Sequence, residues 1–597
     1  MKDFLKFTLA TIVGIVLSGI VLFIIGIVSL AGMMSASQTE TVVKDNSVMK
    51  LELNGTLLER VQETPLGSLS GMLTGSTAET YGLNDILASI QKAKENEKIK
   101  GIYIQANMLE AAPASLQAIR NALANFKESG KFIIAYGDNY TQGLYYLSSV
   151  ADKVLLNPKG SIEWRGLASA PLFYKDMLAK LGIEMQVFKV GTYKSAVEPF
   201  IATEMSAANR EQITSYIGSV WGQMLQGVSD SRKLSVDSLN AFADRMLMFY
   251  PAEESVKSGL ADTLIYKNNV KDYIRRQMGI GEDDILRVLS LKQMVNVKRN
   301  VPKDKSGTIV AVYYASGTIV DQPTAMNMMD SELIIGDDVA KDLKKLQNDD
   351  DVKAVVLRVN SPGGSAYASE QIWHAVKELK AKKPVIVSMG DYAASGGYYI
   401  SCEADTIVAE PTTLTGSIGI FGYIPNIKEL TDKIGLKRDV VTTNKHADFG
   451  GELMRPMDSD EQALMQMAIN EGYRNFVGRC ADGRGTTPEE IEKIAEGRVW
   501  TGEEAVKIGL VDVLGGIDDA IAIAASKAGL DTYSLAPYPA QQGMFEAMFS
   551  GSLPNNDIQA GLLKSQLGEF YRPISFLNNL QHQDKIQARM PFELNIK

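Results

Sequence analysis

The stretch GDYAASGGYYIS, residues 390–401, decides the fold class of this chain together with the segments just before it. It follows an apolar run at residues 384–389, which is typical of a buried parallel strand, and it begins a helix. Before that run come an amphipathic helix pattern at residues 368–381 and another buried strand pattern at residues 354–359. Strands and helices therefore alternate, and the sequence predicts a layered α/β fold with a parallel sheet.

A second copy of this stretch, GDNYTQGLYYLS, lies 253 residues earlier at residues 137–148. Six of the twelve aligned positions are identical, and nearly the same offset relates residues 160–162 to residues 416–418. Such self-similarity indicates a tandem duplication. We expect one domain at residues 48–300 and its duplicate at residues 307–540, joined by a short charged linker.

The N-terminus is predicted to be a membrane anchor. Residues 8–30 form an apolar run of 23 residues, which as a helix is about 35 Å long and exceeds the roughly 30 Å hydrocarbon layer of a bilayer. The run is longer than the apolar region of a cleavable signal peptide, although cleavage is the alternative. We expect a single-pass transmembrane signal anchor at residues 1–31 and a tether at residues 32–47. Lys2 and Lys6 precede the run, so the rest of the chain is expected outside the cytoplasm.

Composition excludes several classes of protein. The net charge is −10, from 61 basic and 71 acidic residues, which argues against a nucleic-acid partner. Two cysteines, Cys402 and Cys480, exclude a disulfide scaffold, and three scattered histidines predict no metal site. No cofactor is expected. The tail at residues 541–597 has no assigned role.

Two loops of the duplicate domain carry the candidate chemistry. The turn Asn-Ser-Pro-Gly-Gly at residues 360–364 follows one buried strand, and its glycines can expose backbone N–H groups to developing negative charge. Ser395 follows the next strand, at the start of a helix, between small residues. Loops after neighbouring parallel strands emerge at one edge of a sheet, so these groups should meet there. They predict a nucleophilic serine beside oxyanion donors, with a helix N-cap as the alternative role for Ser395.

A serine nucleophile needs a base at neutral pH. His374 is expected to face solvent and His446 has no acidic partner at a telling spacing, so a buried lysine with a lowered pKa is the better candidate. Two lysines occupy equivalent repeat positions, Lys194 in the first copy and Lys445 in the second. The first copy has Gln142 in place of the serine, so it cannot form a complete site, but it can lend a base across the interface. Spacing alone does not choose between the two lysines.

Four motifs occur in order along the chain, at residues 191–200 (GTYKSAVEPF), 360–364 (NSPGG), 391–398 (DYAASGGY) and 414–419 (LTGSIG). With these motifs the chain resembles the signal peptide peptidase A family, also called protease IV, in its long duplicated bacterial form. The resemblance extends from the anchor to about residue 540. It implies tandem domains of the fold shared by crotonases and the Clp proteolytic subunit.

The resemblance also implies roles for individual residues. Ser395 is the nucleophile, and Lys194, rather than Lys445, is the base in the long form. Ser417 orients the lysine amine by a hydrogen bond. The implied oxyanion donors are the backbone N–H groups of Gly364, Gly396 and Gly363.

Members of that family are membrane-anchored homotetramers that face the periplasm and degrade signal peptides left in the membrane. The resemblance therefore implies a serine endopeptidase with a Ser-Lys dyad, anchored in the bacterial inner membrane and acting on peptides. Two rival interpretations stay open. One is a crotonase-like acyl-CoA enzyme, which needs no nucleophile at Ser395, and the other is a catalytically silent peptide-binding scaffold at the membrane.

Overall fold

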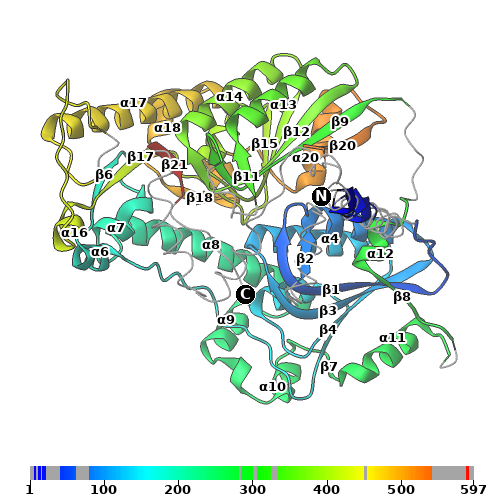
Figure 1. Ribbon diagram of the computed structural model, residues 1–597. Coiled ribbons are helices and arrows are strands. Elements are labelled where there is room, and N and C mark those ends of the chain that lie inside the picture. The colour runs from blue at the N-terminus through cyan, green and yellow to red at the C-terminus, as the bar shows by residue number, and fades with distance from the viewer. Residues whose placement is uncertain are drawn as a thin grey trace.

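The computed structural model describes some residues between 6 and 21 and then residues 40–61, 79–281, 284–299, 306–323, 332–449, 453–540 and 586–590. Figure 1 shows two α/β units side by side, the first built from the N-terminal copy and the second from the C-terminal copy.

The first unit is built on a seven-stranded parallel sheet. Its strands lie in the order β2 (Glu79–Gly82), β1 (Ser47–Leu58), β3 (Ile99–Glu110), β4 (Phe132–Gly137), β5 (Lys153–Leu156) and β7 (Thr263–Leu264), and β8 (Arg287–Ser290) also pairs with β1. Its helices are α3 (Leu83–Glu95), α4 (Pro113–Lys127), α5 (Gln142–Ser148), α6 (Lys175–Leu181), α7 (Glu198–Ile201), α8 (Ala207–Arg232), α9 (Val236–Asp244), α10 (Ala252–Lys257), α11 (Val270–Met278) and α12 (Leu291–Val295).

The second unit is built on an eight-stranded sheet that is parallel except where β16 pairs with β18. Its strands lie in the order β18 (Val499–Thr501), β16 (Leu414–Gly416), β14 (Val385–Ala394), β12 (Val352–Ser361), β9 (Ile309–Ser316) and β20 (Ser534–Tyr538), while β15 (Thr406–Ala409) joins β14 to β19 (Val513–Leu514). Its helices are α13 (Gly336–Asn348), α14 (Ala366–Lys380), α15 (Gly396–Tyr399), α16 (Lys428–Lys433), α17 (Ser459–Arg484), α18 (Pro488–Glu492), α19 (Gly502–Lys507) and α20 (Ile517–Lys527).

The two units repeat one another in topology. The strand order β1-β3-β4-β5-β7 of the first unit corresponds to β9-β12-β14-β15-β19 of the second. The long helices α8 and α17 follow at equivalent places, and each has 26 residues. The parallel α/β fold predicted from the motif at residues 390–401 is therefore confirmed.

The core of the second unit shows why these segments form these elements. Every residue of β14 is buried, as the continuous apolar run predicts for a strand covered on both faces. The apolar stripe of α14, with Ile372 and Val376, covers one face, and α20, with Ala520 and Ala524, covers the other. Ser365 caps the N-terminus of α14 by accepting a hydrogen bond from the Ala368 N–H.

A third sheet is shared between the two units. Its order is β11 (Leu333–Ile335), β10 (Thr318–Val320), β13 (Gly363–Ser365), β21 (Ile586–Arg589), β17 (Phe421–Asn426) and β6 (Glu184–Lys189). The strand β6 comes from the first unit and pairs antiparallel with β17 of the second along its whole length. This pairing fixes the segment that follows β6, which contains Lys194, against the second unit.

Two buried polar contacts also join the units, close to the loop that carries Ser395. Arg358 on β12 forms a bidentate ion pair with Glu59 of the first unit. Its guanidinium nitrogens lie 2.9 and 3.0 Å from the two carboxylate oxygens. Asp391 on β14 accepts hydrogen bonds of 2.7 Å from the backbone N–H and the hydroxyl of Ser115, in the first turn of α4. Burial raises the pKa of Asp391 to about 6.

Among the residues that the structure describes, no helix is long and apolar enough to cross a membrane. Most of the predicted anchor at residues 1–31 lies outside the described residues, and so does most of the tail at residues 541–597. Within that tail, residues 586–590 are described and include the strand β21.

Candidate active site

Ser395 lies at the turn between β14 and α15, in a backbone conformation that is unusual for serine. Its φ is +55°, in a region that costs a residue other than glycine on the order of 1–3 kcal/mol. A 2.8 Å hydrogen bond from the Ser395 N–H to the Gly416 carbonyl holds the turn. Ser395 stands at the N-cap position of α15, as the alternative expected, but its buried side chain makes no capping hydrogen bond to the helix.

Lys194 reaches Ser395 from the other unit. Its Nζ lies 2.7 Å from Ser395 Oγ, 3.0 Å from the Ser417 carbonyl oxygen and 3.1 Å from Ser417 Oγ. Ser417 also has a positive φ, +49°, and its N–H donates to the Arg498 carbonyl at 2.7 Å. The lysine and both serines are fully buried. The structure thus brings together three of the predicted side chains from two halves of the sequence.

The electrostatic surroundings favour a neutral lysine. Complete burial lowers the pKa of Lys194 well below its usual value, because the charged ammonium loses its hydration. A neutral amine keeps a lone pair that can accept a proton from the Ser395 hydroxyl. The ring of Phe421 lies 5.9 Å from Nζ and adds to the apolar walls.

The backbone around Lys194 is clamped by the second unit and by α8. The Tyr193 N–H donates to the Glu496 carbonyl at 2.9 Å, and the Gln212 amide donates to the Tyr193 carbonyl at 3.0 Å. Gly497 has φ +80°, and a Cβ added there would lie 2.7 Å from Lys194 Cα. Glycine is therefore required at position 497 for the lysine to approach.

The glycine turn after β12 lies against the Ser395 loop. Gly363 has φ +98°, and a Cβ added there would lie 2.7 Å from the Gly396 nitrogen. The Gly363 N–H donates to Ser361 Oγ at 3.1 Å, so this predicted oxyanion donor is directed into its own turn. Gly364 and Gly396 are the other two predicted donors. Gly364 follows Gly363 in β13, and Gly396 begins α15, where a Cβ on it would lie 3.1 Å from Gly363 Cα.

The other candidate bases lie elsewhere. Lys445 is exposed on a loop of the second unit and pairs with Asp460. His374 is exposed on α14, as predicted. His446 lies within 3.2 Å of the Glu461 carboxylate, contrary to the expectation that it has no acidic partner. The sequence did not reveal that partner because Glu461 is fifteen residues away.

His446, Asp458 and Glu461 bring ligand atoms within 4.8 Å of one another, which is a spacing that can suit a metal ion. Arg455 already donates to both oxygens of Glu461, at 2.7 and 2.8 Å. The positive charge of the Arg455 guanidinium therefore already balances the negative charge of this cluster.

The corresponding loop of the first unit is built differently. Gln142 stands where Ser395 stands in the second unit, and its side-chain oxygen accepts hydrogen bonds of 2.9 Å from the N–H groups of Arg165 and Gly166. The Gln142 side chain thus holds the local backbone, at the position that corresponds to the Ser395 nucleophile of the second unit.

The geometry also contains contacts that sequence reasoning missed. Arg358, Glu59 and Ser115 were not singled out, and Asp391 was quoted within a motif without a role. A charged arginine inside the apolar run of β12 was the available signal, because such a residue needs a buried partner.

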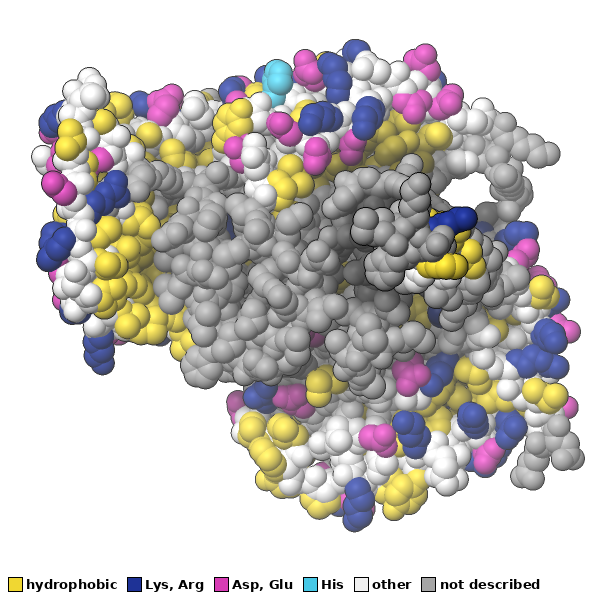
Figure 2. All heavy atoms as spheres, in the orientation of Figure 1, with side chains coloured by type: hydrophobic (Ala, Val, Ile, Leu, Met, Phe, Trp, Pro, Cys, Tyr) yellow, Lys and Arg dark blue, Asp and Glu magenta, His cyan; other side chains and the backbone are white. Residues whose placement is uncertain are grey.

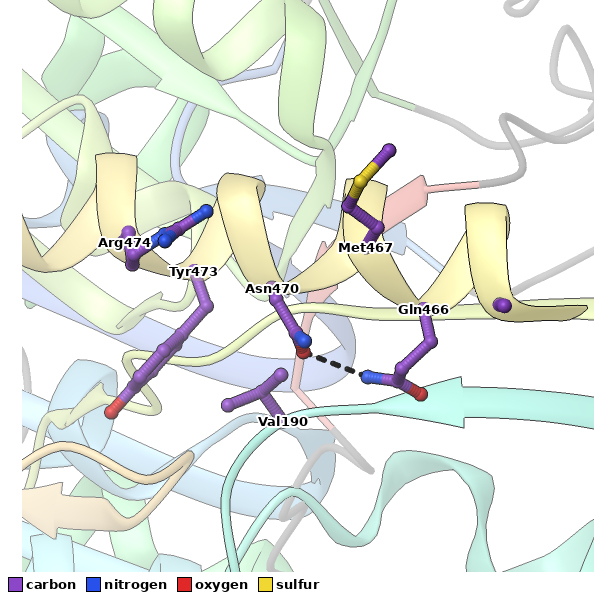
Figure 3. Close-up of a pocket in the computed structure, with 7 residues that line it drawn as sticks. Val190, Gln466, Met467, Asn470, Tyr473 and Arg474 are labelled. Carbon is purple, nitrogen blue, oxygen red and sulfur yellow. Dashed lines mark hydrogen bonds between the residues drawn. The ribbon is translucent and has the colours of Figure 1, made fainter.

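One cavity in the described part of the chain is lined by neither Ser395 nor Lys194. It has a volume of about 500 Å³ and is lined mainly by α17, including Gln466, Met467 and Tyr473, with Val190 at the end of β6 (Figure 3). It is an open depression on the outside of the helix.

Comparison with known proteins agrees with this architecture. The family described as ClpP-like SDH-type serine proteinase matches residues 287–438, and Peptidase family S49 matches residues 125–281 and again residues 377–531. The fold and these matches define a serine protease with duplicated S49 domains and a ClpP-like fold.

Three relatives match over most of their length. The chain is 40% identical to Protease 4 of Salmonella typhi, over 82% of this chain and 79% of that protein. It is 35% identical to Protease 4 of Haemophilus influenzae, over 85% and 83% of the two chains. It is 30% identical to a chloroplastic serine protease SPPA of Arabidopsis thaliana, over 88% and 76%. The chain belongs to Peptidase family S49, and the resemblance predicted from its four motifs is confirmed.

Proposed function

We propose that this protease hydrolyses peptide bonds with a Ser-Lys dyad made of Ser395 and Lys194. The observation that carries the proposal is the 2.7 Å contact between Lys194 Nζ and Ser395 Oγ in a fully buried setting. This distance is within the range over which a base removes a proton directly. The lowered pKa of Lys194 supplies the neutral amine that such a base requires.

The reaction runs in two stages. Lys194 takes the proton of Ser395, and the serine oxygen attacks the substrate carbonyl while the N–H groups of Gly364 and Gly396 hold the oxyanion. Each such donor typically contributes about 3–4 kcal/mol. The protonated lysine then gives its proton to the leaving amine. Water hydrolyses the acyl-enzyme with Lys194 again as the base, which restores the serine.

Ser417 is a positioning residue in this proposal. Its carbonyl and hydroxyl lie within 3.1 Å of Nζ and set the direction of the lone pair toward Ser395. Gly363 supports the site through its positive φ and its close approach to the Gly396 nitrogen.

The duplication has a function in this scheme. The domain at residues 48–300 contributes the base, and the domain at residues 307–540 contributes the nucleophile and the oxyanion donors. The antiparallel pairing of β6 with β17 and the Arg358–Glu59 ion pair support this division, because both hold the units in one relative position.

For the cellular setting, we propose a homotetramer held in the bacterial inner membrane by residues 1–31, with both domains in the periplasm. Its substrates are cleaved signal peptides. The apolar run at residues 8–30 supports the anchor. Figure 2 shows hydrophobic side chains gathered over α6 and α7, where Met177, Leu181 and Ile201 are exposed, and such a patch favours self-association.

A cleavage assay on the purified full chain tests the dyad. We expect Ser395→Ala and Lys194→Ala to lose cleavage of a fluorogenic signal-peptide substrate. Lys445→Ala is the matched control and should cleave like the wild type. Loss of activity in Lys445→Ala alone would assign the base to the second copy. Binding of the peptide without cleavage by the wild type would favour the scaffold, and turnover of an acyl-CoA thioester instead of a peptide would favour the crotonase-like enzyme.

A further inference from the structure

The backbone at Lys194 forms a tight turn, and one glutamine side chain holds this turn from both sides. The Ser195 N–H donates to the Tyr193 carbonyl at 2.8 Å, and Lys194 has φ −74° and ψ +77°. These values are typical of the central residue of an inverse γ-turn. The Gln212 amide on α8 donates to the same Tyr193 carbonyl at 3.0 Å and lies 2.9 Å from Ser195 Oγ. The glutamine therefore contacts the residues before and after the base.

The oxygen of the same side chain contacts the second unit. It accepts a hydrogen bond of 3.2 Å from the N–H of Val499 on β18, and α8 lies against this strand (Figure 1). Val499 is opposite Gly416 in the antiparallel pair of β18 with β16. The Gly416 carbonyl accepts the Ser395 N–H, and Ser417 follows Gly416 in the chain. Gln212 thus connects the turn at the base with the strand pair that holds the nucleophile.

These contacts require one orientation of the amide. The nitrogen of Gln212 faces the Tyr193 carbonyl, and the oxygen faces the Val499 N–H. A rotated amide would place its oxygen against the carbonyl and its N–H groups against the N–H. The side chain is 1% exposed, so bulk water does not compete for these hydrogen bonds. It forms a fixed bridge between the units.

A chain of buried polar groups supports this bridge. The side-chain oxygen of Asn209 lies 3.1 Å from the Gln212 amide nitrogen, and the Asn209 amide donates to the Glu198 carboxylate at 2.9 Å. Glu198 belongs to the motif at residues 191–200 that also carries the base. Its carboxylate accepts from the N–H and the hydroxyl of Ser206 at the N-terminus of α8, where negative charge is favourable. The motif is therefore held to α8 at a second point beyond the turn.

We propose that Gln212 is a positioning residue for the base Lys194. It holds the γ-turn and the strand β18 in one relative position, so that the lysine amine stays within reach of the Ser395 hydroxyl. The inference rests on the proposed Ser-Lys dyad. Proton transfer needs a direct contact between the two groups, and a displacement of about 1 Å can lower the rate about a hundredfold. Gln212 acts through the backbone, because its hydrogen bonds go to the neighbours of Lys194.

Steady-state cleavage of a fluorogenic signal-peptide substrate by the full chain tests this role. We expect Gln212→Met to lower kcat by about 10–100-fold, because methionine fills a similar volume but makes none of the hydrogen bonds. KM should change by less than about twofold, since the substrate groove is unaltered. A loss of activity that comes from KM instead of kcat would overturn the proposal.

Gln223→Met is the matched control. Gln223 lies on the same helix and donates across the interface to Glu503 at 2.9 Å, but it is roughly 16 Å further along α8. Both variants lose a hydrogen bond between the units, so both should unfold at a lower denaturant concentration than the wild type. Only Gln212→Met should lose kcat, and Gln223→Met should stay within about twofold of the wild type. Equal losses of kcat in the two variants would assign the effect to the interface as a whole and overturn the proposal.

A milder variant keeps the proposal testable if Gln212→Met does not fold. Ser195→Ala removes one of the oxygens that the Gln212 amide contacts and leaves the rest of the turn in place. We expect it to lower kcat about three- to tenfold. An unchanged kcat in folded Ser195→Ala, or in folded Gln212→Met, would overturn the role of Gln212.

A double variant shows whether Gln212 acts through the lysine. In the background of Lys194→Ala, Gln212→Met should lower the residual kcat no further, because the group that it positions is absent. A further tenfold loss would show that Gln212 acts on another group and would overturn the proposal. The proposed function fails separately. Wild-type activity in Lys194→Ala overturns the dyad and the positioning role together, whereas an inactive Lys194→Ala beside a fully active Gln212→Met overturns the positioning role alone.

Discussion

The pH dependence of the Lys194 side chain gives the sharpest test of the proposed base. Burial lowers the pKa of Lys194 in the folded protein, whereas the unfolded chain returns it to its ordinary value of 10.5. Below the lowered pKa the amine is protonated and cannot accept the serine proton. We therefore expect kcat/KM to rise tenfold per pH unit below that pKa and to level off above it.

The same shift affects stability, and its sign is fixed. Between the lowered pKa and 10.5 the unfolded chain carries one proton more than the folded chain, so the unfolding free energy rises with pH. One proton corresponds to about 1.4 kcal/mol per pH unit within that window. Lys194→Met fills a similar volume but has no proton to bind, so it should lose this slope.

The comparison of wild type with Lys194→Met depends on how steeply the unfolding free energy changes with pH, and not on its absolute value. Lys194→Met also removes the hydrogen-bond partner of Ser395 and Ser417, and each buried group left without its partner costs about 1–3 kcal/mol at every pH. Chemical denaturation of wild type and variant across neutral to alkaline pH separates the two effects. Parallel stability curves, or a kcat/KM profile that is flat or falls from acidic to neutral pH, would refute the neutral-lysine mechanism.

Three further predictions follow from the site and the interface. Lys194→Ala should lower kcat by about 10²–10⁴-fold in peptide hydrolysis, while Lys445→Ala should change kcat by less than about twofold, because Lys445 is exposed and paired with Asp460; equal losses in the two variants would contradict the assignment. Gly363→Ala should abolish cleavage while circular dichroism stays native, since the added Cβ meets the Gly396 nitrogen at 2.7 Å; full activity would show that the turn can relax. Arg358→Met should lower the unfolding free energy by about 3–5 kcal/mol in denaturant titration, because it leaves the buried Glu59 carboxylate without its partner; an unchanged midpoint would mean that the pair contributes little.

The local sequence predicted the strands and helices around Ser395 well. The buried strand pattern at residues 354–359 lies within β12, the run at residues 384–389 lies almost entirely within β14, and the helix pattern at residues 368–381 corresponds to α14. These elements carry their own signal, because continuous apolar runs and amphipathic stripes are local properties. The meeting of the two loops at one sheet edge followed from parallel topology alone.

The choice between Lys194 and Lys445 could not come from spacing. Lys194 reaches the site because β6 pairs with β17 across the two units, and such pairing is decided by tertiary contacts. The strand β21 was missed for a similar reason. Its residues, Ile-Gln-Ala-Arg, show too short an alternation to stand out, and the strand exists because β13 and β17 offer it free edges on both sides.

The placement of base and nucleophile on separate halves has a consequence for biogenesis. Until the two units dock, the Ser395 hydroxyl has no amine beside it, because Lys194 belongs to the first unit. Under the proposed mechanism the enzyme is silent until β6 docks on β17, so a nascent or misassembled molecule poses no danger to its neighbours. In the proposed mechanism, completion of the tertiary structure is itself the step that switches the protease on.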